Sequence, residues 1–305
     1  MSARQTLVVN PVAGAGHALD RWPGLRAELE RRGALKCVVA HDPDALDRAA
    51  RDAASAGEIV VVAGGDGTWN RVVNAVNGAP LTLGLLPAGS GNDWCRSLGL
   101  PLDPLAAAGV IASGSPRAVD LIAVNGRRFC TVGGVGLFAD TTALVGRWGA
   151  PDARSRRLVR LLGAHAYLAG ATILLLSSAE VALPLTVTGE GPDGSWHWRG
   201  SAHALFVANQ RRLGAGLVLP VPSEPDDGVC EIGIVPRRGR VSLAWHLQAL
   251  RSGRPVGEDV LLVRHIRRAR VESDRPMPFV ADGEPLLVAP TLDVEVCPGA
   301  VHVLA

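Results

Sequence analysis

Short apolar runs alternate with helical patterns over the first part of the chain. Each run is rich in β-branched or aliphatic residues and is followed by a turn; the runs are TLVVN (6–10), LKCVVA (35–40), EIVVVA (58–63) and LTLGLL (81–86). Continuous apolar strands separated by helices are typical of a parallel sheet that is covered on both faces. The pattern therefore predicts a doubly wound α/β domain over residues 1–123.

The pattern changes near residue 125. Asn125 and Gly126 separate two β-rich runs, and an Asn-Gly pair is a strong signal for a tight hairpin. Similar turn signals occur in PDGS (192–195), DDGV (226–229) and ADGE (281–284). Apart from a helical segment around 150–175, we expect antiparallel sheet in a sandwich or flattened barrel over residues 124–289. The last strand, at about 290–305, is a candidate to return to the first domain.

Composition agrees with a globular chain of two domains. The 305 residues are 48% hydrophobic and 20% charged, which is ordinary for a protein with a packed core. The net charge of +2 is too close to neutral to indicate a nucleic-acid partner. The five cysteines show no C-x-x-C pair, so the sequence predicts neither a disulfide framework nor a zinc site.

The most apolar stretch, residues 158–176, is interrupted by Arg160 and His165. It falls short of the ~20 uninterrupted apolar residues that a membrane-spanning helix needs, so a buried helix running into a strand is the better interpretation. The first residues reach a proline and glycines before any apolar stretch that would suit a signal peptide. We therefore expect a cytoplasmic protein, with peripheral contact at the inner membrane surface as an added hypothesis.

The segment EIVVVAGGDGTWNRVVNAV (58–76) joins a strand to a helix through a glycine-rich loop. Val60 to Ala63 predict a buried strand, and apolar residues then recur at helical spacing at Trp69, Val72, Val73 and Val76. Gly64, Gly65 and Gly67 stand at the helix N-terminus, where free backbone N–H groups and the helix dipole attract anions. A phosphate site is therefore favoured over a plain turn, which needs fewer glycines.

Asp66 is unusual in such a loop because a carboxylate repels phosphate. A carboxylate at this position has a function if it contacts Mg²⁺ or accepts a proton. Two further glycine loops follow strands, NPVAGAG (10–16) and LPAGSGND (86–93), and loops at the carboxyl ends of neighbouring parallel strands share one crevice. The chain contains no G-x-x-x-x-G-K-[ST] motif, and GAGHAL (14–19) lacks the third glycine of a dinucleotide fingerprint.

Six motifs together resemble the catalytic family of the diacylglycerol kinases, which includes bacterial lipid kinases and sphingosine kinases. The motifs are NPVAGAG, GGDGTWN, LPAGSGNDWCRSLGLP, VDLIAVNGRRFCTVGGVG, PDDGVCEIGIV and DGEPL, in the order and at the spacing of the family. The resemblance covers nearly the whole chain. It implies an α/β plus β architecture, in which a doubly wound parallel-sheet nucleotide domain is followed by a β-rich, sandwich-like lipid-binding domain, with ATP between them.

The resemblance also assigns roles to individual residues. The nucleotide-binding candidates are Asn10, Pro11, Gly14, Gly64, Gly65, Asp66, Gly67, Thr68, Asn70, Ser90, Asn92 and Asp93. Asp227 resembles the aspartate of a structural Mg²⁺ site, with backbone carbonyls near Glu224 and Val229 as further ligands. Asp282 and Glu284 resemble the acidic pair that supplies the general base, and Asp66 is the other candidate. Without the resemblance, both DDG and DGE are read as hairpin turns.

Two regions leave their roles open. Arg71 stands where the family commonly has an acidic residue, so it either strengthens ATP binding or has a changed role. Residues 137–180 include RWGAPDARSRRLVR, which suits a basic surface resting on anionic lipid, or equally a solvated helix whose apolar residues face the core. RHIRRAR (264–270) has no interleaved aromatics, so we expect no nucleic acid as a partner. A homodimer is a further hypothesis.

Three functional hypotheses follow. The first is an ATP- and Mg²⁺-dependent kinase that phosphorylates a hydroxyl of a diacylglycerol-like or sphingoid lipid. The second is a kinase of the same architecture that acts on a soluble metabolite, as NAD kinases do. The third is a nucleotide-binding regulator without transfer activity. The sequence favours the first because the second domain resembles that of lipid kinases.

Overall fold

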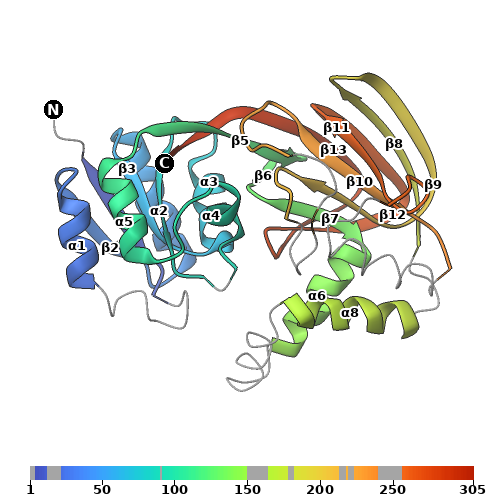
Figure 1. Ribbon diagram of the computed structural model, residues 1–305, viewed down its shortest axis with the longest axis horizontal. Coiled ribbons are helices and arrows are strands. Elements are labelled where there is room, and N and C mark those ends of the chain that lie inside the picture. Colours follow the sequence, from blue (N-terminus) through green and yellow to red (C-terminus); the bar gives the residue numbers. More distant parts are fainter. Residues whose placement is uncertain are drawn as a thin grey trace.

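The computed structural model describes residues 4–11, 22–89, 91–149, 164–177, 182–212, 218, 223–239 and 256–305. Its ribbon has two lobes: helices surround a small sheet in the N-terminal lobe, and long curved strands form the C-terminal lobe (Figure 1). The strands β5 (Pro116–Val124) and β13 (Glu284–Leu304) run between the two lobes.

Parallel strands form the sheet of the N-terminal lobe. They are β1 (Gln5–Val9), β2 (Leu35–Val39), β3 (Ile59–Gly64) and β4 (Thr82–Pro87). Their order across the sheet is β4-β3-β1-β2, and each neighbouring pair is parallel. The apolar runs therefore predict these strands to within one residue. The winding reverses between β1 and β3, which creates a crevice at their carboxyl ends.

Helices cover both faces of this sheet. They are α1 (Trp22–Glu30), α2 (Pro43–Ser55), α3 (Asp66–Val76), α4 (Asp93–Ser97) and α5 (Pro104–Ser113). Leu29 of α1 packs in one cluster with Val61, whereas Val72 of α3 packs in another with Val62. Because Val61 and Val62 are consecutive in β3, they point to opposite faces of the sheet. The core therefore consists of two layers, one on each side of the strands.

Asp-Pro pairs begin two of these helices. The Asp42 carboxylate accepts a hydrogen bond from Ala45 N at 2.7 Å, and Asp103 accepts one from Ala106 N at 3.0 Å. A proline at the first helical position loses no hydrogen bond, because its N–H would have no partner within the helix. The sequence therefore defines where α2 and α5 start.

Antiparallel strands dominate the C-terminal lobe. Besides β5 and β13 they are β6 (Arg127–Phe129), β7 (Val132–Gly136), β8 (Leu183–Gly191), β9 (Gly194–Ala208), β10 (Cys230–Pro236), β11 (Leu262–Ile266) and β12 (Arg268–Ala281). Phe129 and Phe279 pack against each other in the core between them with tilted rings, whose centroids are 5.8 Å apart. The expected α/β plus β architecture is present.

Three of the four predicted hairpins form. Asn125 and Gly126 connect β5 to β6 with φ angles of 49° and 77°, and Asp282 and Gly283 connect β12 to β13 with φ angles of 50° and 82°. The turn after Gly191 connects β8 to β9. The interpretation of DDGV as a tight hairpin is wrong, because β9, the antiparallel partner that precedes β10, already ends at Ala208, well before this turn.

The strand β13 joins the two lobes. It pairs with β12 and β5 in the C-terminal lobe, and His302 and Val303 near its end pair in parallel with β4. The described strands therefore belong to one 13-stranded sheet. The expected limits of the two domains remain a prediction, although the last strand ends beside β4.

Two helices, α6 (Leu137–Gly149) and α8 (Ala164–Ser177), lie beside each other below the C-terminal lobe (Figure 1). The helical segment expected around 150–175 is therefore only partly described, since residues 150–163 lie outside the described part. Among the described residues, no helix combines the length and the apolar character that crossing a membrane requires.

Candidate active site

The carboxyl ends of β1, β3 and β4 are joined by hydrogen bonds. Asn10 N donates to Ala63 O at 3.2 Å, and the Asn10 side-chain amide donates to Thr68 Oγ1 at 3.1 Å. Ala88 N, just after β4, donates to Gly64 O at 2.7 Å. The described parts of the three predicted loops therefore meet at the winding reversal of the sheet.

The loops after β3 and β4 touch each other through bare backbone. A Cβ atom on Gly65 would lie 2.8 Å from Gly89 Cα, and one on Gly89 would lie 2.6 Å from Gly65 Cα. No side chain larger than hydrogen fits at either position. This close approach is the physical reason for glycine in both motifs.

Gly65 also begins α3 without a side-chain hydrogen bond to the helix. The first N–H groups of a helix have no partner within it, and the helix dipole makes this end attractive to anions. The N-terminus of α3 is therefore suited to a phosphate group.

Asp66 binds the neighbouring helix. Its carboxylate accepts hydrogen bonds from Asp93 N at 3.1 Å and from Trp94 N at 3.0 Å. Below this contact the rings of Trp69 and Trp94 pack with centroids 6.2 Å apart. Asp66 thus caps α4 and holds the loop after β4 against α3.

Asn92 shapes the same loop from within. Its side chain accepts a hydrogen bond from Gly89 N at 3.0 Å and donates one to Gly89 O at 2.9 Å, with its own φ at 52°. The next residue, Asp93, is partly buried. Burial raises the pKa of Asp93, and the nearby charge of Asp66 raises it further.

Asp282 is buried and fully engaged. One oxygen accepts from Asn70 Nδ2 at 2.8 Å and from Cys130 N at 2.9 Å. The other accepts from Thr131 N at 2.8 Å and from Thr131 Oγ1 at 2.6 Å. Burial raises the pKa of Asp282, while these hydrogen bonds oppose the shift. Asp282 therefore connects α3 to the segment between β6 and β7.

Glu284 lies two residues further, beside the glycine loop. A Cβ atom on Gly67 would be 3.6 Å from Glu284 Cγ and 3.9 Å from Glu284 Oε1. Glu284 as a whole residue is exposed to solvent. Its carboxyl group is nevertheless partly desolvated by its neighbours, which raises its pKa. The carboxylates of the other two candidate bases, Asp66 and Asp282, both accept hydrogen bonds from the backbone. Glu284 lies against the start of α3, and its carboxylate accepts no such bond from the described residues.

The predicted metal ligands lie on the turn before β10. Asp227 Oδ1 accepts a hydrogen bond from Val229 N at 3.1 Å, and Glu224 lies on the same turn. The buried Asp120 carboxylate fixes this turn by accepting from Gly228 N at 2.6 Å. Within the described residues, no group of three or more His, Cys, Asp or Glu side chains is arranged to hold a metal ion. A cation here would depend on backbone carbonyls, as the resemblance implies.

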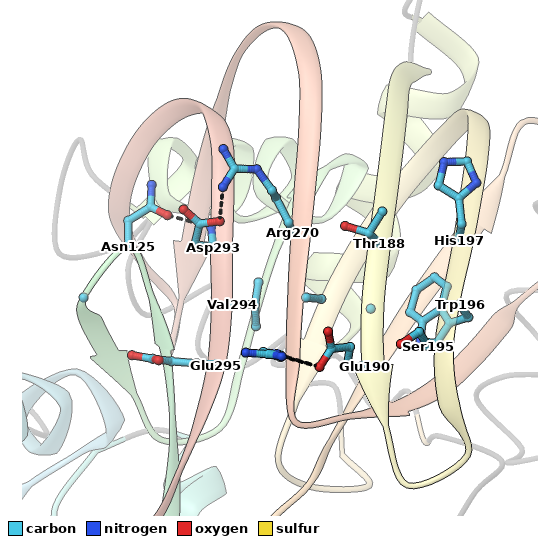
Figure 2. Close-up of a pocket in the computed structure, with 14 residues that line it drawn as sticks. Asn125, Thr188, Glu190, Ser195, Trp196, His197, Arg270, Asp293, Val294 and Glu295 are labelled. Carbon is cyan, nitrogen blue, oxygen red and sulfur yellow. Dashed lines mark hydrogen bonds and ion pairs between the residues drawn. The ribbon is translucent and has the colours of Figure 1, made fainter.

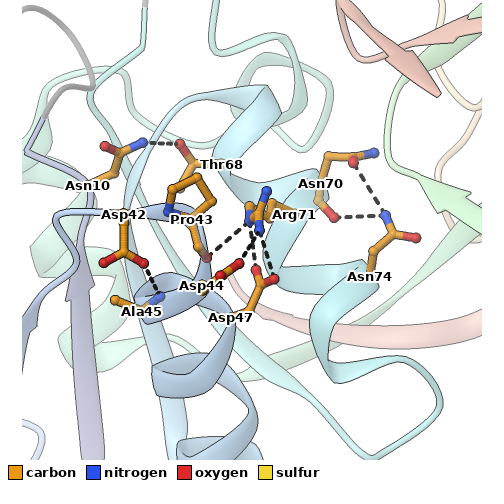
Figure 3. A network of polar contacts seen from close by, with 10 residues as sticks. All are labelled: Asn10, Asp42, Pro43, Asp44, Ala45, Asp47, Thr68, Asn70, Arg71 and Asn74. Atoms are coloured by element: carbon orange, nitrogen blue, oxygen red, sulfur yellow. Dashed lines mark hydrogen bonds and ion pairs between the residues drawn. The ribbon is translucent and has the colours of Figure 1, made fainter.

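Arg71 is engaged at a distance from the loop (Figure 3). Its guanidinium donates to both oxygens of Asp47, at 2.7 and 2.9 Å, and to Pro43 O at 3.2 Å. Asp44 lies 3.6 Å away as a further ion pair. Arg71 therefore clamps α3 to the start of α2, and the expectation that it strengthens ATP binding finds no support in this geometry.

A separate groove of about 640 Å³ crosses β8, β9, β12 and β13 (Figure 2). Its two arginines are already paired: Arg268 with Glu190 at 2.6 Å and Arg270 with Asp293 at 2.9 Å. None of the predicted site residues lines this groove. It is therefore distinct from the crevice at the glycine loops.

Known protein families match both lobes. Residues 4–124 match the diacylglycerol kinase catalytic domain, and residues 148–305 match the YegS C-terminal NAD kinase beta sandwich-like domain. A Pseudomonas fluorescens protein named "Probable lipid kinase YegS-like" is 32% identical over 287 residues, which cover 92% of this chain and 89% of that protein. The chain belongs to the diacylglycerol kinase catalytic-domain family.

Other members of the family agree with this assignment. A protein of the same name from Stenotrophomonas maltophilia is 29% identical, over 93% of this chain and 89% of that protein. A crystal structure of a diacylglycerol kinase from Bacillus anthracis has a TM-score of 0.75 and covers 99% of this chain and 96% of that chain. Its identity is 22%, so this likeness shows a shared fold.

The sequence did not single out two residues that the fold brings close to the acidic side chains of the site. Tyr167 of α8 lies close enough to Asp93 and Glu284 for their charges to raise its pKa, after burial as the larger cause. Arg212 lies near enough to Asp93 to lower the pKa of that carboxyl. No local motif marks either residue, because both come from distant segments. Gly14 and Ser90 lie outside the described residues.

Proposed function

We propose that this chain is a lipid kinase, which transfers the γ-phosphate of ATP, with Mg²⁺, to a hydroxyl group of a diacylglycerol-like or sphingoid lipid. Membership of the family supports a phosphotransferase, and the names of the relatives support a lipid acceptor. The observation that carries the proposal is the contact between Gly65 and Gly89 at the start of α3, with Glu284 against Gly67.

The backbone at the start of α3 holds the phosphates in this proposal. Phosphoryl transfer needs phosphates held in line and neutralised charge more than it needs covalent help. The amides of Gly65 to Gly67 provide donors at the helix N-terminus, where the helix dipole is favourable, and Asn10 supports Thr68 from the side. Asp66 and Asn92 do not bind the phosphates in this proposal; their side chains shape the loop after β4 that lies beside them.

Glu284 is the general base of the proposed reaction. The acceptor hydroxyl loses its proton to the carboxylate as its oxygen forms the bond to the γ-phosphorus, and ADP leaves with the pair of electrons from the broken bond. Asp282 is poorly suited, because both of its oxygens already accept two hydrogen bonds. Asp66 is likewise occupied by the N-terminus of α4. A raised pKa makes Glu284 a stronger base than an ordinary glutamate.

Magnesium would neutralise charge on the phosphates, and a structural ion would tie down the turn before β10. Asp227 would hold that structural ion together with the carbonyls of Glu224 and Val229. The Asp120 contact to Gly228 N keeps this turn in place without a metal.

The acceptor reaches Glu284 from the side of α8. The sequence of this helix is apolar nearly all round, AHAYLAGATILLLS, and Ile173 is 47% exposed. Tyr167 of the same helix lies near Glu284. A peripheral contact with a membrane through α8 would deliver the lipid hydroxyl to the base.

Transfer of labelled phosphate from ATP tests the proposal. The acceptors are vesicles with diacylglycerol or a sphingoid base, and a set of soluble alcohols that includes NAD. We expect transfer to a lipid, and a loss of about 100-fold or more in kcat for Glu284→Gln because the base contributes about that much. Glu295→Gln, an exposed glutamate on the same strand, serves as the matched control with unchanged kcat.

The remaining outcomes decide between the alternatives. Transfer to a soluble alcohol but to no lipid would favour a metabolite kinase. ATP binding without transfer to any acceptor, unchanged in Asp66→Asn and Asp282→Asn, would favour a regulator.

A further inference from the structure

Asn74 occupies the contact between the nucleotide-binding helix α3 and the edge strand β6. Its Nδ2 donates to Arg128 O at 2.7 Å, and its Oδ1 accepts from Arg128 N at 2.9 Å. The side chain thus binds both backbone groups of Arg128, as a neighbouring strand would. Among the described strands, β6 pairs only with β5, so Asn74 takes the place of a second partner.

Asn70, one turn earlier, extends this contact to the acidic turn. Its Nδ2 donates to Arg128 O at 3.1 Å and to Asp282 Oδ2 at 2.8 Å. Asn74 Nδ2 in turn donates to Asn70 O at 2.9 Å and lies 3.3 Å from Asn70 Oδ1, which orients the Asn70 amide (Figure 3). Asn70 is therefore used for this connection, whereas the resemblance assigns it to the nucleotide.

The connection closes on the glycine loop. Asp282 also accepts hydrogen bonds from Cys130 N and, at its other oxygen, from Thr131 N, and Glu284 follows after a single residue. Glu284 then returns to Gly67 at the start of the same helix. The helix that holds the phosphates and the turn that carries the base are thus joined at two places, at Gly67 and through the two asparagines.

We propose that Asn74 is a positioning residue of the transfer reaction, because its amide fixes β6 and, through Asn70 and Asp282, the place of Glu284 relative to the N-terminus of α3. The inference rests on the proposed function. A displacement of about 1 Å at a reacting group can lower the rate of a reaction about 100-fold, so a clamp outside the site can control the rate.

Asn74→Asp tests this role without changing the size of the side chain. The variant still accepts from Arg128 N, but its second oxygen faces the carbonyl oxygens of Arg128 and Asn70, so the clamp is lost. We expect kcat to fall about 100-fold, while the KM for ATP changes less than about threefold. The acidic limb of the pH profile of kcat should also move, because Glu284 leaves its partly buried position.

A double-mutant cycle shows whether Asn74 acts through Glu284. In a Glu284→Gln background, Asn74→Asp should lower the residual rate by less than about twofold, because the base is already absent. Val72→Ala serves as the control for lost stability, because it removes buried methyl groups from the same helix and leaves a cavity in the core. If Asn74→Asp unfolds the protein, Asn74→Ala replaces it, since alanine removes the clamp without placing two oxygens face to face.

Three results would overturn the inference. The first is that both Asn74 variants keep the kcat and the pH profile of the wild type. The second is that Val72→Ala loses as much kcat as Asn74→Asp, and the third is that Asn74→Asp lowers the rate as strongly in the Glu284→Gln background as in the wild type. Absence of transfer by the wild-type protein to every acceptor is a different result, which overturns the proposed function and this inference with it.

Discussion

At the scale of single residues, the chemistry depends on which carboxylates are already occupied. Asp66 and Asp282 both accept hydrogen bonds that hold the structure, whereas Glu284 stands against Gly67 with one side open to solvent. The motif DGE alone cannot distinguish its two acids. The distinction arises because the left-handed turn at Asp282 directs that carboxylate toward Thr131.

Glu284 should determine the lower limit of the pH range of activity. Its pKa is raised by burial, so the catalytically competent carboxylate is lost when the pH falls through a value above that of an ordinary glutamate. We expect the acidic limb of kcat/KM to lie above pH of about 4.3, the ordinary glutamate value. The limb should vanish in Glu284→Gln; a limb that persists there unchanged would assign it to another group.

Asp282 should matter for stability. Asp282→Asn places an NH₂ group among donors that need an acceptor, and unsatisfied buried donors cost about 1–3 kcal/mol each. We expect the free energy of unfolding in urea to fall by about that amount or more. Asp274→Asn, at an exposed aspartate on the preceding strand β12, should leave the unfolding free energy unchanged. Equal unfolding curves for the two variants would contradict this assignment.

At the scale of elements, local patterns predicted α3 and its strand well. Val60 to Ala63 are buried in β3, and Trp69 and Val72 lie in the core beneath α3, as their spacing indicates. The contacts of Asp66 with α4 and of Asn74 with β6 could not be predicted, because they join segments that are distant in the sequence. Arg71 is similar: its partner Asp47 belongs to another helix.

Gly65→Ala should disrupt the contact between the two glycine loops. The added methyl would lie 2.8 Å from Gly89 Cα, so the loops must separate. We expect a lower melting temperature and a loss of the stabilisation that ATP with Mg²⁺ gives to the protein. Gly146→Ala is the matched control, because its Cβ meets nothing within 4 Å and glycine in a helix costs about 0.5–1 kcal/mol relative to alanine. Retained protection by ATP in Gly65→Ala would refute the loop contact.

Arg71→Ala should weaken the contact between α2 and α3 without changing nucleotide affinity. The pair with Asp47 is partly exposed, so its loss costs about 0.5–1 kcal/mol after screening by solvent. Arg51→Ala, an exposed arginine on α2, is the control. Calorimetric titration with ATP should give equal affinities for the variants and the wild type; a large loss in Arg71→Ala would place this arginine at the phosphates.

At the scale of the whole molecule, the continuous sheet brings phosphate site and base together. β13 begins at Glu284 beside the glycine loop and ends beside β4, so one strand belongs to both lobes. The sequence indicated the two kinds of domain, and the family motifs indicated the acidic turn. The sequence also suggested that the last strand returns to the first domain. It could not indicate which strand β13 pairs with there or in which register, since both depend on how a long strand bends over many residues.

Hydrogen exchange with and without ATP and Mg²⁺ tests the central claim, that nucleotide binds on bare backbone between the glycine loops and Glu284. We predict slower exchange of amides in Gly64–Asn70, in the loop after β4 and in the turn at 282–284. Protection confined to the groove of β8 and β12, or no protection at the three predicted segments, would contradict it.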